Sequence, residues 1–183
     1  WELHHPIEYQ NHIFDTLFAA GEDLGLQPFG IRAMDSMRLE KSYRMVGTEL
    51  SIEYSAFESG MDRFVKADKG NFLGRDALLA WQEAGIRNKL VMLEVHDVDD
   101  ADALGNNALL MDGELVGRAN GGGFGFRVDM SLALGMVRPD LAEPGPQLEI
   151  DILGRTYRAI VFPDSPVDRK TERLREVIGA TDC

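Results

Sequence analysis

The sequence predicts an α+β protein in which a mixed, helix-containing part precedes a small all-β part. Two patterns indicate this fold class. Apolar residues recur with helical spacing in the first half, whereas from residue 88 onward apolar and polar residues alternate in short runs. Turn residues separate these runs at intervals of roughly 8 to 12 residues, which is typical of a small antiparallel barrel or sandwich. We therefore expect two domains, residues 1–86 and residues 87–183.

Three helices are expected in the first domain. Apolar side chains follow helical spacing from Ile7 to about Leu24, and Pro28 prevents further continuation. A second helix is expected from about Ile31 to Lys41, and a third between Asn71 and Gly85, where the glycine supplies a stop signal. Residues 43–70 have no clear period, so we expect short strands and loops there.

The second domain is predicted to contain six short strands. Asp112-Gly113 between two of them suits the positive φ angles of a type I′ hairpin turn. We expect Gly121–Gly123 to form a flexible loop and a final short helix to lie around Glu172 to Ile178. The expected strands are Lys89–His96, Ala108–Met111, Glu114–Gly117, Leu132–Arg138, Leu148–Ile152 and Tyr157–Phe162.

Composition limits the kind of partner. The chain has 31 acidic and 19 basic residues and a net charge of −12, so we expect no nucleic-acid or membrane partner, since phosphate contacts need clustered Lys and Arg. The single cysteine, Cys183, excludes an intrachain disulfide and favours a reducing compartment, either the cytoplasm or the mitochondrial matrix of a eukaryote. The chain begins with Trp1 and shows no signal-peptide pattern, so we expect a piece of a longer protein.

The sequence contains no self-sufficient catalytic motif. It has neither a Gly-x-x-x-x-Gly-Lys-Ser/Thr phosphate loop nor a His-Glu-x-x-His pair. The four histidines, His4, His5, His12 and His96, are the candidate metal ligands. His4 and His5 are adjacent and would point to opposite faces of a strand, so we expect the histidines to have surface or supporting roles and expect no metal site. Ser36 follows an aspartate, but no base is arranged around it. We therefore expect no catalytic residue in this chain.

One stretch, GIRAMDSMRLEKSYRMVG from residue 30 to residue 47, places Arg32, Asp35 and Arg38 among methionines. Such charges either face water or are paired or meet a ligand, because burying them alone is costly. Asp35 and Arg38 have the i,i+3 spacing of a local structural pair. Arg32 is a candidate to bind a carboxylate or a polarised ring oxygen, and Glu2 could accept two hydrogen bonds from an aminopyrimidine edge. Sequence spacing leaves open whether Glu2 and Arg32 meet.

The segments WELHHP, GLQPFGIRAMDSMRLEKSYRMVGTEL, FLGRDAL and KLVMLEV together resemble the folate-binding aminomethyltransferase family. This family includes the glycine-cleavage aminomethyltransferase and the C-terminal parts of dimethylglycine and sarcosine dehydrogenases, and the resemblance is stronger to the dehydrogenase branch. It implies that residues 1–86 form the second half of a folate-binding α/β domain and that a β-barrel domain follows. It also implies that Glu2 binds the pterin ring of tetrahydrofolate and that Arg32 contacts the folate.

The resemblance further implies transfer of a one-carbon unit from an N-methyl amine to tetrahydrofolate, with FAD in a missing upstream domain. The catalytic aspartate of the family lies in an N-terminal half that this chain lacks, so that half is the expected partner and the chain alone is expected to be inactive. An aromatic residue that closes the folate site has no match, and Val167 lies near its expected place. Two alternatives remain: a non-catalytic folate-binding or assembly module, and a folate-dependent demethylase of a methylated sulfur compound.

Overall fold

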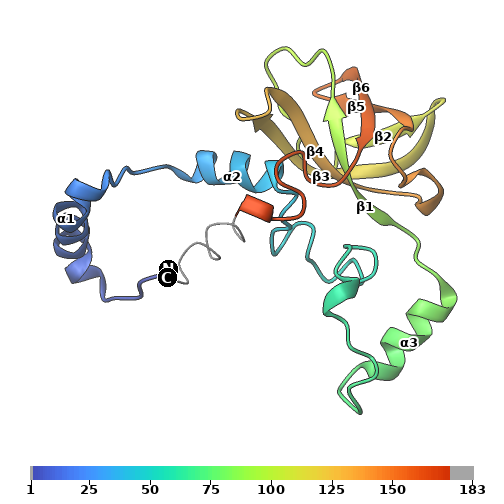
Figure 1. Cartoon of the computed structure of the whole chain (residues 1–183). Helices are drawn as coiled ribbons and strands as arrows, with labels where there is room; N and C mark the ends of the chain where they lie inside the picture. The colour runs from blue at the N-terminus through green and yellow to red at the C-terminus, as the bar shows by residue number, and fades with distance from the viewer. Residues whose placement is uncertain (1, 174–183) are drawn as a thin grey trace. The chain divides into compact units, whose positions relative to one another are not determined.

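The computed structural model describes residues 2–173 of the chain. The chain separates into two compact units, Trp1–Ala33 and Met34–Cys183. Figure 1 traces both.

The N-terminal unit consists mainly of one helix. The expected helix between residues 7 and 24 is confirmed as α1 (Gln10–Gly21), with 3₁₀ turns at Ile7–Tyr9 before it and Glu22–Leu24 after it. Gly25 ends this run in the left-handed conformation at φ 69°, where its N–H donates to the carbonyl of Glu22. Gly21 is the one buried residue of α1.

Most large apolar side chains of the N-terminal unit are exposed. None of the apolar side chains in residues 2–33, the described part of this unit, belongs to a hydrophobic core cluster. A folded domain normally covers such side chains, so an apolar surface of this extent is unusual for a folded unit. The exposed set is Leu3, Ile7, Tyr9, Phe14, Leu17, Leu24, Leu26, Phe29 and Ile31.

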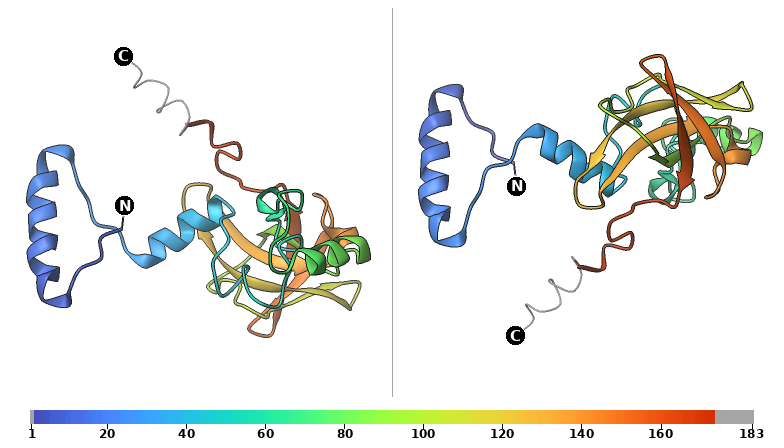
Figure 2. Two further views of the ribbon diagram at one scale, coloured as in Figure 1. Left: turned by 90° about the horizontal axis from the view of Figure 1, so that it is seen from below. Right: turned by 90° about the horizontal axis from the view of Figure 1, so that it is seen from above.

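The second unit contains a closed antiparallel barrel, seen from three directions in Figures 1 and 2. The strand order β1-β4-β3-β2-β5-β6 closes because β1 pairs with both β4 and β6. The barrel alternative of the sequence prediction is therefore confirmed. The strands are β1 (Lys89–Val95), β2 (Ala108–Met111), β3 (Glu114–Gly125), β4 (Met130–Val137), β5 (Gln147–Ile152) and β6 (Arg155–Phe162).

Alternation along β1 sends its side chains into two separate cores. Val91, Leu93 and Val95 join the cluster that draws on all six strands and fills the barrel. Leu90 and Met92 point to the other face, where they belong to a second cluster that includes Leu39 of helix α2 (Ile31–Glu40). This second cluster fixes the end of α2 against the outside of the barrel wall.

The prediction of a flexible loop at Gly121–Gly123 is wrong. These glycines lie within β3 and pair with residues 132–134 of β4, after a register shift between Ala119 and Gly121. A Cβ atom at Gly122 would lie 2.7 Å from the carbonyl oxygen of Leu132. Gly122 therefore permits close approach of the backbones and is not a sign of mobility.

The expectation of short strands in residues 43–70 is also wrong. This segment has one isolated bridge, between Val46 and Leu50, and one 3₁₀ turn at Asp62–Phe64. Its backbone groups are paired in local turns, such as the bond from the Leu50 N–H to the Met45 carbonyl, and so do not form a ladder.

The third helix is confirmed as α3 (Arg75–Ala84), which follows Gly74 at φ 87°. The expected hairpin turn is also present, with Asp112 at φ 52° and Gly113 at φ 80°. The expected C-terminal helix around Glu172 to Ile178 extends outside the described residues. Within residues 2–173, every helix is too short or too polar to cross a membrane.

Candidate functional site

Arg32 lies in the first turn of α2 with its side chain exposed. The turn begins at Gly30, whose carbonyl accepts the N–H of Ala33. No hydrogen bond or ion pair formed within residues 2–173 engages its guanidinium. Its planar fork of N–H donors is thus open to an anionic or polarised oxygen.

Glu2 lies in the irregular segment that precedes the first 3₁₀ turn, and its side chain is 85% exposed. Its Oε1 atom is 3.6 Å from Nε2 of His4, a pair that is ionic when the imidazole is protonated. Within the described residues no hydrogen bond or ion pair joins Glu2 to Arg32. Both groups are free to meet a ligand, and their assignment to one folate site stays a prediction.

The expected local pair of Asp35 and Arg38 is confirmed. Nε of Arg38 donates to Oδ1 of Asp35 at 2.7 Å. The same guanidinium also reaches the carbonyl of Tyr43 at 3.2 Å and Oε2 of Glu49 at 3.4 Å. Arg38 therefore ties the last turn of α2 to the loop that follows it. Of Arg32, Asp35 and Arg38, Arg32 is the one without a partner in the part of the chain that the structure describes.

Glu49 is a buried carboxylate that the sequence reasoning missed. Its side chain is fully buried, and Oε2 accepts hydrogen bonds from the Met45 N–H and the Thr48 hydroxyl, each at 2.8 Å. Its Oε1 atom has no hydrogen-bond partner within the described residues. The nearest sequence signal is Gly47-Thr48 before the glutamate, which is typical of a turn with local side-chain bonds.

Two further contacts fix α2 to the barrel. The Ser36 hydroxyl donates to the carbonyl of Phe124 at 2.7 Å, so this serine is a structural anchor. Oε1 of Glu40 accepts the backbone N–H of Arg127 at 2.7 Å. The Glu40 carbonyl in turn accepts the N–H of Val167 at 3.2 Å, which gives Val167 a backbone role in holding the segment that follows β6.

Glu58 joins the loop to the start of β1. Oε2 accepts the N–H of Ser55 at 2.8 Å, and Oε1 accepts the N–H of Asn88 at 3.1 Å. Burial raises the pKa of Glu58, but the hydrogen bonds from Ser55 and Asn88 outweigh it, and the pKa lies below its ordinary value of 4.5. The Ser55-x-x-Glu58 spacing is that of a capping box, a sequence signal that could have identified this pair.

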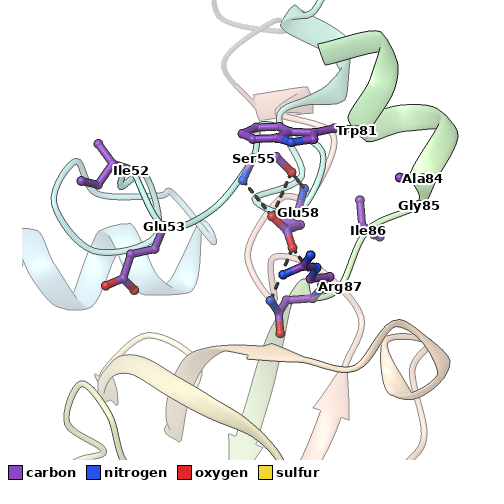
Figure 3. Close-up of a pocket in the computed structure, with 10 residues that line it drawn as sticks. Ile52, Glu53, Ser55, Glu58, Trp81, Ala84, Gly85, Ile86 and Arg87 are labelled. Atoms are coloured by element: carbon purple, nitrogen blue, oxygen red, sulfur yellow. Dashed lines mark hydrogen bonds between the residues drawn. The ribbon is translucent and has the colours of Figure 1, made fainter. Parts of the chain in front are cut away.

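A cavity of about 350 Å³ adjoins Glu58, with Trp81 of α3 and Arg87 also in its lining. Figure 3 shows the indole of Trp81 over the Ser55–Glu58 pair. Both oxygens of the Glu58 carboxylate already accept hydrogen bonds, so this group stabilises the wall of the cavity. Neither Glu2 nor Arg32 lies there.

The comparisons with known proteins agree with this architecture. The model of the GCVT N-terminal domain matches residues 1–69, and the model of the glycine cleavage T-protein C-terminal barrel domain matches residues 88–168. The aminomethyltransferase T of the glycine cleavage system from Bartonella henselae superposes with a TM-score of 0.78 at 22% identity, over 90% of this chain and 45% of that chain. The fold is thus that of the C-terminal part of an aminomethyltransferase.

Two curated relatives have higher identity. Human mitochondrial dimethylglycine dehydrogenase is 34% identical over 176 residues, which are 96% of this chain and 20% of the relative. An aminomethyltransferase of Desulfitobacterium hafniense is 31% identical over 163 residues, 89% of this chain and 44% of the relative. The chain belongs to the glycine cleavage T-protein (aminomethyltransferase) family, as the sequence motifs predicted. It spans less than half the length of these relatives.

Proposed function

We propose that this chain is the C-terminal part of a tetrahydrofolate-dependent aminomethyltransferase-like protein. In the intact protein a one-carbon unit would pass from an N-methyl amine of the dimethylglycine or sarcosine type to tetrahydrofolate. The observation that carries this proposal is the match of two consecutive family domains to one chain, at whose start Glu2 and Arg32 lie open. The domain boundary at residue 86 belongs to the same proposal.

The two side chains fit a reduced folate chemically. A pterin presents a ring N–H beside an exocyclic amine, which matches the two oxygens of the Glu2 carboxylate. The Arg32 guanidinium suits a ring oxygen or a carboxylate of the same ligand. Tetrahydrofolate, when bound, supplies two nucleophilic nitrogens that take up the methylene group as 5,10-methylenetetrahydrofolate. Glu2 and Arg32 would orient the pterin, and orientation is a large contribution to such a transfer.

The upstream part of the longer protein would supply what this chain does not. A C–H bond of the N-methyl group must break with loss of two electrons and one proton, a hydride equivalent, to give the iminium, and FAD in an upstream domain is the proposed acceptor. The exposed apolar set of residues 2–33 supports a covering partner, which we propose to be the N-terminal half of the same protein. The catalytic aspartate would lie in that half, so the 183-residue chain alone should be inactive.

A labelled-methyl assay tests this function. The full-length protein is given dimethylglycine with an isotopically labelled N-methyl group, with and without tetrahydrofolate. We expect the label in 5,10-methylenetetrahydrofolate when folate is present and in formaldehyde when it is absent. Equal formaldehyde release under both conditions would favour the non-catalytic folate-binding or assembly module. Labelled product from a methylated sulfur donor alone would favour the demethylase.

A further inference from the structure

A cavity in the second unit gathers positive charge in a chain whose net charge is −12. Its volume is about 560 Å³, within the range of small-molecule sites. Four basic side chains and one carboxylate line it: Lys41, Arg44, Arg63, Arg169 and Asp164. Because the chain as a whole repels anions, this cavity is a local exception that an anionic ligand would recognise.

Arg44 is the fixed cation of the cavity. Its Nε donates to the Ser59 carbonyl at 3.2 Å and its Nη1 to the Ser42 carbonyl at 2.7 Å, and its side chain is 22% exposed. Gly60, at φ 68°, lies so close that a Cβ atom would be 3.0 Å from Nη2 of Arg44. Within residues 2–173 no hydrogen bond engages Nη2. The loop therefore holds one guanidinium edge in place as a preorganised donor.

Arg63 and Arg169 add two exposed cations around Arg44. Neither takes part in an ion pair within the described chain, and the Arg63 guanidinium lies 4.6 Å from the centroid of the Phe64 ring. Lys41 is occupied differently, because its Nζ donates to the Asp168 carbonyl at 2.5 Å. The cavity thus has one positioned and two free guanidinium groups.

Asp164 offsets only part of this charge. Its Oδ1 is 3.9 Å from Nη1 of Arg44, and its side chain is 48% exposed. A weak, half-exposed contact of this kind contributes little and leaves the guanidinium available.

We propose that this cavity binds a small polyanion that has two or more phosphate or carboxylate groups. Guanidinium forks form paired hydrogen bonds with such groups, and several separated cations favour a multivalent anion over chloride. The residues that line this cavity do not include Glu2 or Arg32, so the proposed site differs from the proposed folate site.

Calorimetry on the full chain at constant ionic strength tests the proposal, with pyrophosphate and citrate as the two probes. We expect one saturable site per chain for at least one of them, and the preferred probe identifies the phosphate or the carboxylate source. Arg63→Gln combined with Arg169→Gln should weaken that binding at least about tenfold. Arg155→Gln is the matched control, because Arg155 is 68% exposed on β6 and outside the cavity.

A gain of affinity provides a second readout. Asp164→Asn removes the one carboxylate of the lining and should tighten binding severalfold, a result that loss of fold cannot imitate. The proposal is overturned if neither probe saturates the unmodified chain at about 0.15 M salt. It is equally overturned if Arg155→Gln weakens binding as much as the double variant, or if Asp164→Asn leaves affinity unchanged.

Discussion

Nη1 of Arg38 lies 3.4 Å from Oε2 of Glu49, a carboxylate with no exposed surface. The helix that presents Arg32 therefore ends in an ion pair with a buried charge. Removing one partner of such a pair leaves the other charge buried and uncompensated, which costs more than the pair itself contributes.

Arg38→Met should therefore destabilise the chain strongly, by about 3 kcal/mol in the free energy of unfolding. Arg32→Met is the matched control, because it makes the same substitution on the same helix at an exposed position that has no hydrogen-bond or ion-pair partner among residues 2–173. We expect that control to change stability by less than about 0.5 kcal/mol. Urea unfolding of both variants gives the comparison, and equal losses would refute the structural role of Arg38.

Glu58 should make the free energy of unfolding decrease at acidic pH. Its pKa in the folded chain lies below its ordinary value of 4.5, so its ionised form stabilises the fold fully above pH 4.5. This contribution is lost as the pH falls through the folded-state pKa. Glu58→Gln should therefore reduce the loss of unfolding free energy between about pH 7 and pH 3. The control Glu143→Gln changes an exposed carboxylate and should lose as much unfolding free energy over this pH range as the unmodified chain. Identical pH profiles for the two variants would count against the prediction.

Two glycines of β3 offer a sharp test of close packing. A Cβ atom at Gly122 would lie 2.7 Å from the Leu132 carbonyl oxygen and 2.8 Å from Cβ of Ala103, whereas one at Gly121 meets nothing within 4 Å. Gly122→Ala should destabilise the barrel by about 2 kcal/mol, and Gly121→Ala should be close to neutral. Thermal unfolding of the two variants measures the difference. Similar thermal unfolding midpoints for the two variants would indicate that the backbone around Gly122 yields as easily as a pliable loop.

The turn between β5 and β6 contains a strained residue. Leu153 has φ 52° and is 74% exposed, and Gly154 follows at φ 78°. Asparagine tolerates this left-handed conformation better than leucine, so Leu153→Asn should stabilise the chain by about 0.5 to 1 kcal/mol. The same change at Leu104, which is 56% exposed and not among the positive-φ residues, should give no such gain. Chemical denaturation compares the two.

Sequence periodicity predicted the helices and the barrel strands because apolar spacing is a local property of each element, whether its apolar side chains are buried, as in the strands, or exposed, as along α1. It failed at Gly121–Gly123, where the pairing depends on backbone contact with β4 and not on side chains. It also missed Glu49, since the burial of a charge depends on Arg38 and on local turns that have no period. The Asp35–Arg38 pair was predictable because i,i+3 spacing is a local property.

The meeting of Glu2 and Arg32 could not be derived in the same way. Residues 2–33 have no hydrophobic core cluster of their own in the described structure, so side-chain packing within this unit does not fix the two groups relative to each other. The family motif supplied the hypothesis, and both side chains lie open to a ligand. Their convergence stays a prediction.

The affinity of the full-length protein for a stable reduced folate, measured by calorimetry before and after Glu2→Ala, tests the central claim most directly. Loss of two charge-assisted hydrogen bonds should raise Kd at least about thirtyfold, with less effect on the chemical step. Glu8→Ala, an exposed carboxylate of the same unit, should leave Kd unchanged. A Glu2→Ala protein that binds the folate as tightly as the unmodified one would contradict the assignment of this site.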